Sequence, residues 1–146
     1  MKIKKIECEQ FAGIKEKAIE FGDNVNIIYG KNESGKSTIL ELIHALLFQS
    51  ANIDKRSDKK FIDTNFPHNA EGIDGNVIDG KITLENGGDN YVLSKEWQIK
   101  GGSEKIKDKN GTYIKGQKEI NAILSEILKY DEGVYNEIIF SSQKLP

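Results

Sequence analysis

One short pattern constrains the fold of this 146-residue chain more than any other feature. Residues 30–37 read GKNESGKS and fit the phosphate-loop pattern G-x-x-x-x-G-K-[ST]. In such a loop the glycines let backbone N–H groups approach a polyphosphate, the lysine reaches its outer phosphates, and the last hydroxyl binds Mg²⁺. We therefore predict a nucleotide site built from nine consecutive residues: Gly30, Lys31, Asn32, Glu33, Ser34, Gly35, Lys36, Ser37 and Thr38.

The sequence on both sides of this loop supplies the context that the motif requires. Residues 25–29 (VNIIY) form a short apolar run of the kind that builds a buried strand. Apolar side chains then recur at helical spacing, so we expect a helix from about Lys36 to Phe48. A loop that opens a helix is an anion site. ATP and Mg²⁺ are the predicted ligands, with Lys36 as the catalytic lysine and Ser37 as a metal ligand.

Composition excludes several classes of protein. The chain has 37% hydrophobic residues, 30% charged residues and a net charge of −2, which argues against the whole chain being a nucleic-acid-binding surface. Its start lacks the apolar stretch of a signal peptide, and no run approaches the roughly 18 apolar residues of a membrane span. Cys8 is the one cysteine, which excludes an internal disulfide framework. We expect a cytoplasmic protein with no membrane partner.

The rest of the chain reads as strands and one further helix. Residues 2–8 and 18–21 are predicted strands that form an antiparallel pair before the nucleotide strand. Residues 49–76 are polar and weakly patterned, and we expect an ordered excursion there. From residue 76 an alternation of apolar residues predicts a β-meander, and a clean amphipathic helix follows from about Gln117 to Lys129.

An ATPase needs a second magnesium carboxylate, usually an Asp at the end of an apolar strand, and a group that orients the attacking water. The candidates for the carboxylate are Asp63 and Asp79. Each follows too short an apolar run, and neither is followed by Glu. The chain is therefore predicted to hold half of an ATPase site.

The order of these elements resembles a known family. A strand, a turn at Phe11, a second strand, the run NVNIIYGKNESGKSTILELIHALLF, a β-meander, a helix and a late glutamine are similar to the N-terminal half-head of SMC-like ATPases. This ABC-type class includes the SbcC-like ATPases of double-strand-break repair. The form GKNESGKST, with Glu33 where many relatives have Gly, is more similar to the YhaN-like branch.

The resemblance covers essentially the whole chain and implies a fold class. That class is α/β: a P-loop NTPase of ABC type, in which an antiparallel β-meander flanks the nucleotide strand and helix. Residues 1–146 would form the N-terminal lobe, from the phosphate loop to the glutamine loop, without the coiled coil and the C-terminal half. By position, Gln143 would be the glutamine that contacts Mg²⁺ and the attacking water, and so a catalytic residue and a metal ligand.

The resemblance also implies partners. The C-terminal half of the same head would supply the signature motif, the second carboxylate strand and the catalytic Glu. Two heads would engage around ATP, and a metallo-nuclease and double-stranded DNA are further expected partners. One departure concerns Ala12, because relatives often have a basic residue there that helps to hold the nucleotide. Lys15 or Lys17 is the possible substitute.

A basic stretch bears on the DNA expectation. Residues 95–118 contain seven lysines against three acids, Glu96, Glu104 and Asp108. Such a stretch is either a face that follows a DNA duplex or a set of solvated strand edges that resist aggregation, and the sequence leaves both open.

Other functions also use a phosphate loop. A small-molecule kinase is disfavoured because two strands precede the loop and Arg56 is the only arginine. A transporter ATPase is disfavoured by the polar excursion and the meander. A nucleotide-gated scaffold that does not act on DNA stays open. The leading prediction is the ATP-binding half of an SMC-like ATPase that acts in DNA double-strand-break repair or DNA-end processing.

Overall fold

The computed structural model describes residues 2–21, 33–66, 77–99 and 101–128. No helix in these ranges is long and apolar enough to cross a bilayer. In chain order the elements are β1 (Lys2–Phe11), β2 (Ile14–Glu20), α1 (Glu33–Phe48), β3 (Asn52–Ile53), α2 (Lys59–Asn65), β4 (Ile78–Asn86), β5 (Asp89–Ile99), β6 (Ser103–Lys107), β7 (Tyr113–Ile114) and α3 (Gln117–Leu128).

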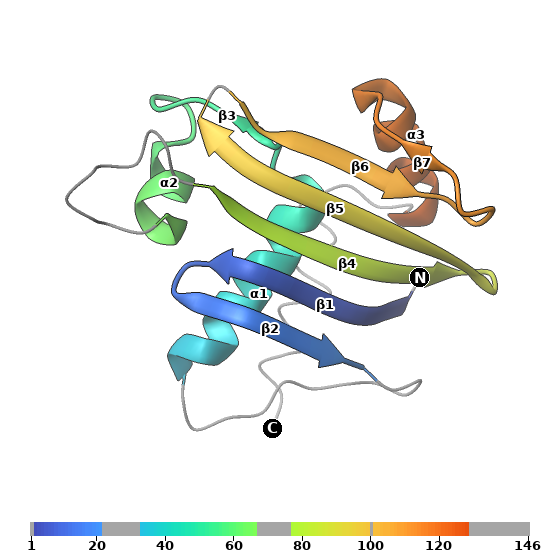
Figure 1. The fold of residues 1–146 in the computed structure, drawn as a ribbon, viewed down its shortest axis with the longest axis horizontal. Coiled ribbons are helices and arrows are strands. Elements are labelled where there is room, and N and C mark those ends of the chain that lie inside the picture. The colour runs from blue at the N-terminus through green and yellow to red at the C-terminus, as the bar shows by residue number, and fades with distance from the viewer. Residues whose placement is uncertain (1, 22–32, 67–76, 100, 129–146) are drawn as a thin grey trace.

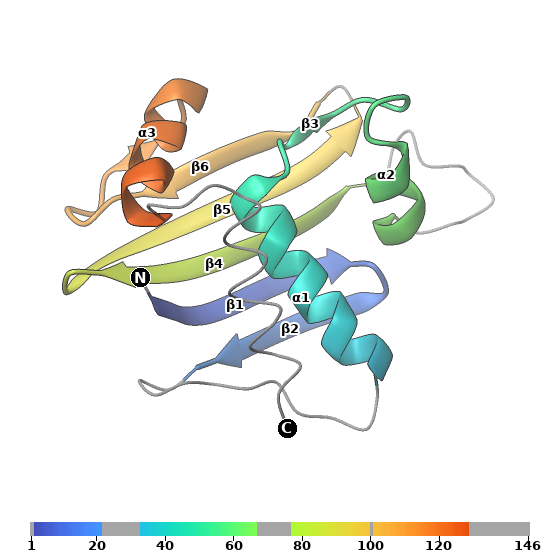
Figure 2. The same ribbon diagram turned by 180° about the vertical axis from the view of Figure 1, so that it is seen from behind.

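The strands form one seven-stranded sheet. Six of them follow the order β2-β1-β4-β5-β6-β7, and each neighbouring pair is antiparallel. The short β3 runs parallel to the last residues of β5. Figure 1 looks onto one face of this sheet, and Figure 2 shows α1 and α3 lying across the opposite face. The N-terminal hairpin therefore joins the meander through β1 and β4, and α1 and α3 cover the same face of the sheet.

Apolar side chains alternate along the central strands and turn toward the helices. Ile78, Ile82 and Leu84 of β4 are fully buried, and the register places Leu93 and Trp97 of β5 beside them. Successive side chains of a strand point to opposite faces, so this row is the period-2 pattern of the sequence. The alternation also predicts that Trp97 packs into the sheet, and its complete burial confirms this.

Two adjacent glycines make the turn between β4 and β5. Gly87 and Gly88 have φ values of 61° and 85°, and they connect the paired residues Asn86 and Asp89. A two-residue hairpin of this kind needs positive φ at both central positions, which glycine adopts without steric cost. Gly87 and Gly88 thus form the two-residue turn of the β4–β5 hairpin.

A glycine also sets how closely α1 approaches the sheet. A Cβ atom at Gly80 of β4 would lie 2.7 Å from Cδ1 of Leu42 and 3.2 Å from Cδ2 of Leu46. Both leucines belong to α1 and are buried. The missing side chain at position 80 therefore lets the helix rest directly on the backbone of β4.

The far end of β1 leaves β4, and Asp79 fills the gap between them. Its Oδ1 atom accepts hydrogen bonds from the backbone N–H groups of Glu9, at 3.0 Å, and Gln10, at 2.9 Å. Beyond this point Phe11 is completely buried, and its ring contacts that of Trp97 with centroids 5.7 Å apart. The carboxylate thus replaces a strand partner where β1 turns its last residue into the core.

The predicted elements are largely confirmed. The antiparallel pair, the meander and the C-terminal amphipathic helix are present, and the excursion after α1 forms β3 and α2. α1 begins at Glu33, three residues before the predicted Lys36, because the polar loop residues of its first turns carry no apolar periodicity. The predicted nucleotide strand at 25–29 lies outside the described residues.

We predict that Gly80→Ala destabilises the fold by about 1–3 kcal/mol, the usual cost of overpacking a core. The added methyl group would meet Leu42 and Leu46 and push α1 off the sheet. Urea denaturation of wild type and variant measures the difference. In a Leu42→Val background, which lacks the Cδ1 atom of the shortest contact, the same change should cost less. An equal cost in both backgrounds would refute this explanation.

Candidate nucleotide site

The phosphate-loop residues that the structure describes open α1. Residues 33–37 have helical backbone and form the first turns of this helix. Their side chains lie outside the described part, as do Gly30, Lys31, Asn32 and Gln143. Thr38, the last of the nine predicted residues, is half-buried in α1. The structure therefore places Gly35, Lys36 and Ser37 at the N-terminal end of a helix that packs on a sheet.

The first turn of a helix suits a phosphate. Its leading N–H groups have no partner inside the helix, and the aligned peptide dipoles place partial positive charge there. The backbone of α1 from Glu33 onward thus has the geometry of an anion site, and Lys36 and Ser37 are of the residue types that would add an ammonium and a hydroxyl. Within the described ranges, no group of three or more His, Cys, Asp and Glu side chains could hold a metal ion.

The turn between β1 and β2 and the end of α2 are connected to α1. The backbone N–H of Ala12 donates to the carbonyl of Asn65 at 3.0 Å, and the Asn65 amide donates to Oε1 of Glu41 at 3.5 Å. Asn65 is buried, and its Oδ1 atom has no hydrogen-bond partner within the described ranges. The hairpin turn, α2 and the N-terminal end of α1 lie toward the same end of the molecule in Figures 1 and 2.

Position 12 carries no basic side chain for a nucleotide at this end. Ala12 has a φ of 49° and uses its N–H in the bond to Asn65. Lys15 and Lys17 are both exposed on β2, which leaves each of them open to a ligand.

The two carboxylates considered as magnesium ligands have other roles. Asp63 lies on α2 and forms an ion pair with Lys59, one helical turn away. Asp79 binds the backbone of β1, as described above. Asp63 lies on a helix, and Asp79 lies at the start of β4 with its carboxylate bound to the backbone of β1, so neither is an Asp at the end of an apolar strand.

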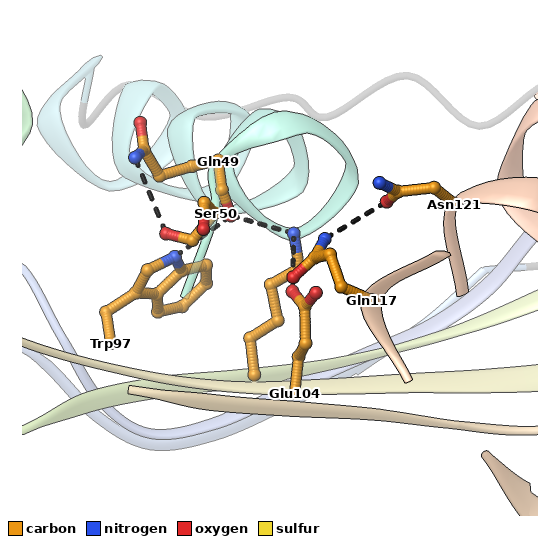
Figure 3. A network of polar contacts seen from close by, with 7 residues as sticks. Gln49, Ser50, Trp97, Glu104, Gln117 and Asn121 are labelled. Carbon is orange, nitrogen blue, oxygen red and sulfur yellow. Dashed lines mark hydrogen bonds and ion pairs between the residues drawn. The ribbon is translucent and has the colours of Figure 1, made fainter. Parts of the chain in front are cut away.

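The other end of α1 is anchored by a buried polar network (Figure 3). The carbonyl of Gln49 follows the last helical residue and accepts from Nζ of Lys95 at 2.8 Å and from Nε1 of Trp97 at 3.3 Å. Lys95 also lies 3.7 Å from Oε2 of Glu104, and the two side chains are only 4% and 7% exposed. Burial lowers the pKa of the Lys95 ammonium from 10.5 to about 8, while the Glu104 carboxylate acts in the opposite direction.

Sequence reasoning missed this network, although a signal was present. Position 95 belongs to the same every-other row as Leu93 and Trp97, so the pattern itself turns Lys95 inward. Its neighbour across the ladder, Glu104, faces the same way. A lysine on the buried row of one strand opposite a glutamate on the next is the pattern to look for.

Comparison with known families decides the class of the protein. Residues 5–145 match an AAA domain. The chain belongs to the AAA domain family. The match covers nearly all of the chain and supports an α/β ATPase-type domain, in agreement with the sheet and helices described above.

Three known proteins that are similar to this AAA domain are named as DNA repair or DNA replication and repair proteins. The DNA double-strand break repair Rad50 ATPase of Sulfurisphaera tokodaii is 28% identical over 148 residues, which cover 98% of this chain and 16% of that protein. The DNA replication and repair protein RecF of Streptococcus agalactiae is 33% identical over 87 residues, which cover 58% of this chain and 23% of that protein. RecF of Lactococcus lactis is 46% identical over 46 residues, which cover 32% of this chain and 13% of that protein.

The AAA domain thus spans less than a quarter of each of these three relatives. Together with the family match, they confirm the resemblance to SMC-like ATPases that the sequence predicts.

The basic stretch of the AAA domain needs one correction. Lys95 and Glu104 were counted among its charges, but both are buried on the helix side of the sheet and pair with each other. The exposed lysines of the stretch that the structure describes are Lys105, Lys107, Lys109, Lys115 and Lys118.

The ammonium groups of two of these lysines lie over the same aromatic ring. The Nζ atoms of Lys105 and Lys107 lie 4.8 and 5.8 Å from the ring centroid of Tyr113, which is 54% exposed. Alternation along β6 places both lysines on the sheet face opposite Ile106, a buried residue that faces the helices. Two of the exposed lysines of the stretch, Lys105 and Lys107, are therefore on the face opposite α1, at the β6–β7 edge.

We predict a pH-dependent contribution of Lys95 to stability. Its pKa is about 8 in the folded chain and 10.5 as the reference for the unfolded chain. Between these values the unfolded state binds more protons, so this group makes the free energy of unfolding rise with pH. Its unfavourable contribution is fully present below about pH 8 and relieved toward pH 10.5, by at most about 3 kcal/mol.

The measurement is urea denaturation from pH 7 to pH 10, with Lys95→Met as the reference. The difference in unfolding free energy, wild type minus variant, should become more favourable to wild type as the pH rises. A difference that stays constant over this range would show that Lys95 titrates as it does in the unfolded chain.

Proposed function

We propose that the chain is the ATP-binding half of an SMC-like ATPase head that acts in DNA double-strand-break repair or DNA-end processing. One observation carries this proposal: residues 33–37 of a complete phosphate-loop pattern form the N-terminal turns of α1 in an AAA domain. The printed functions of the Rad50 and RecF relatives support a role in DNA repair.

In this proposal the nine loop residues bind ATP. The helix N-terminus and Lys36 hold the phosphates, Ser37 holds Mg²⁺, and Gln143 orients the metal and the attacking water. Bound ATP supplies the phosphoanhydride bond whose hydrolysis drives the cycle. The chain contributes binding and orientation, because neither Asp63 nor Asp79 is available as the second carboxylate.

The missing groups would come from the C-terminal half of the same head. The much greater length of the relatives supports such a half elsewhere in the full-length protein. ATP would then bring two heads together, and a metallo-nuclease would be a further partner. We also propose a cytoplasmic location, which a role in DNA repair like that named for the Rad50 and RecF relatives supports.

We also propose that Lys105, Lys107 and Lys109 contact the phosphates of double-stranded DNA. They lie on or next to β6, and the first two flank the exposed ring of Tyr113. Two acids are adjacent to them in sequence: Glu104 pairs with Lys95, and Asp108 accepts from the N–H groups of Asn110 and Thr112 and so belongs to the turn. The edge thus offers the exposed ammonium groups of Lys105 and Lys107 on one side of the sheet, and that of Lys109 in the turn that follows.

We predict that this chain alone does not turn over ATP, because it supplies only half of the site. Mixing it with a separately made C-terminal half should create hydrolysis that Lys36→Ala abolishes. A coupled assay for ADP release measures the rate. Steady turnover by the isolated chain, lost in Lys36→Ala, would contradict the half-site proposal, whereas absence of ATP binding in every form would contradict the nucleotide site itself.

The DNA contact predicts a change in salt dependence. Each lysine that binds a phosphate releases condensed counterions, so log K against log[salt] has a slope of about −0.9 per contact. Changing Lys105, Lys107 and Lys109 to Gln should therefore flatten the slope by up to about 2.7. Titrations of duplex DNA with full-length protein at several salt concentrations give the slope, and ATP affinity should stay unchanged.

A charge-matched variant provides the control. Changing Lys55, Lys59 and Lys60 to Gln removes the same charge near α2, which lies away from the β6–β7 edge (Figure 1). This variant should keep the wild-type slope. The same slope in all three proteins would assign Lys105, Lys107 and Lys109 to solvation.

A further inference from the structure

We propose that Lys95 is a positioning residue for the nucleotide site: by capping the C-terminal end of α1, it sets where the phosphate loop at the other end of the helix lies. The inference rests on the proposed nucleotide-binding function. It assigns a role in that function to a side chain that cannot touch the nucleotide, since Lys95 contacts the far end of the helix.

Lys95 contacts the C-terminal end of α1 directly. Nζ of Lys95 donates to the carbonyl of Gln49 at 2.8 Å, and Gln49 directly follows the last residue of α1. The carbonyls at the end of a helix lack intrahelical partners and carry partial negative charge. A buried ammonium group is therefore the strongest cap that a side chain can offer here, and Nε1 of Trp97 adds a second donor to the same oxygen.

Packing alone does not require a lysine at position 95. Position 95 lies in the buried row of β5 between Leu93 and Trp97, where an apolar side chain would cost nothing to desolvate. The lysine is tolerated because Glu104 and the Gln49 carbonyl surround its charge. Even so, one oxygen of Glu104 has no hydrogen-bond partner among the described residues. A buried pair of this kind adds little net stability, so its use is better sought in the placement that it enforces.

The apolar contacts of α1 and its hydrogen bond to Lys95 fix the position of the helix with different precision. The leucines of α1 on the sheet make many weak contacts, which change gradually when the helix slides along its axis. A hydrogen bond tolerates only a few tenths of an ångström. α1 has 16 residues and behaves as a rod about 24 Å long. A shift of its capped end therefore reappears at its N-terminal end, where the loop amides must meet the phosphates.

The capped end of α1 also connects to β6, one of the two strands of the basic β6–β7 edge. Lys95 of β5 donates to the Gln49 carbonyl, and its Nζ atom lies 3.7 Å from the carboxylate of Glu104 in β6, which Figure 3 labels. Glu104 directly precedes Lys105 in β6. The strand that carries the proposed DNA contacts thus helps to hold the side chain that caps α1.

The test compares two variants of the full-length protein. Lys95→Met keeps the aliphatic stem and removes the cap, but it leaves Glu104 buried without a partner. Lys95→Met/Glu104→Leu removes the cap and the orphan charge together, which restores an apolar core. Lys81→Met, an exposed lysine of the neighbouring strand β4, is the matched control. Stability, ATP affinity and steady-state kinetics are measured for each.

We expect both Lys95 variants to bind ATP about tenfold more weakly and to lose a larger factor in kcat, because misplacement of about 1 Å costs up to about a hundredfold in rate. The double variant should show these losses although its thermal stability returns close to that of wild type. Lys81→Met should match wild type in all three measurements.

Two results would overturn the inference. If the double variant regains both stability and wild-type ATP kinetics, Lys95 acts through stability alone. If the single variant already binds and hydrolyses ATP like wild type, the cap has no role in positioning. A wild-type protein that binds no ATP would instead remove the proposed function, on which the inference depends.

Discussion

The structure depends on the contact between one helix and one strand. α1 lies on β4 at Gly80, where no side chain separates the helix from the sheet. The N-terminal end of this helix carries the phosphate-loop residues, and its C-terminal end meets Lys95 and Trp97 of β5. The sheet thus holds the helix in its C-terminal half and at its C-terminal end, and the phosphate-loop residues lie at the opposite end of the helix.

The same arrangement explains why the two faces of the sheet differ. The face toward α1 carries the buried row of β4 and β5, whereas Lys105 and Lys107 stand on the opposite face beside Tyr113. Nucleotide and nucleic acid would therefore bind on opposite sides of a layer one strand thick. β6 contributes a side chain to each face of the sheet, because Glu104 and Lys105 are consecutive residues that point to opposite faces.

Much of this fold could be predicted from the sequence because its signals are local. Alternation predicted β4 and β5, and the apolar stripe predicted α3 nearly to its last residue. The nucleotide site stays a prediction, and it rests on a motif of consecutive residues whose last part opens α1. Lys95 with Gln49 and Ala12 with Asn65 could not be predicted, because each contact joins segments that only the folded chain brings together. Charge counting failed at Lys95 for a related reason, since it ignores which face of a strand a residue occupies.

The strand order has a consequence for the order in which the chain folds. β4 and β5 are joined by a two-residue turn, so their pairing is local and closes a very short loop. β1, in contrast, pairs Lys2 with Glu85 and Glu7 with Lys81, across the whole of α1 and α2. During synthesis from the N-terminus, α1 leaves the ribosome before β4 and β5, the strands that will bury its leucines. Of the strands that the structure describes, only the β1–β2 hairpin precedes this helix, and Leu42 and Leu46 lack the backbone of β4 at Gly80 until the β4–β5 hairpin emerges, so completion of that hairpin sets the earliest moment at which α1 can take its place on the sheet.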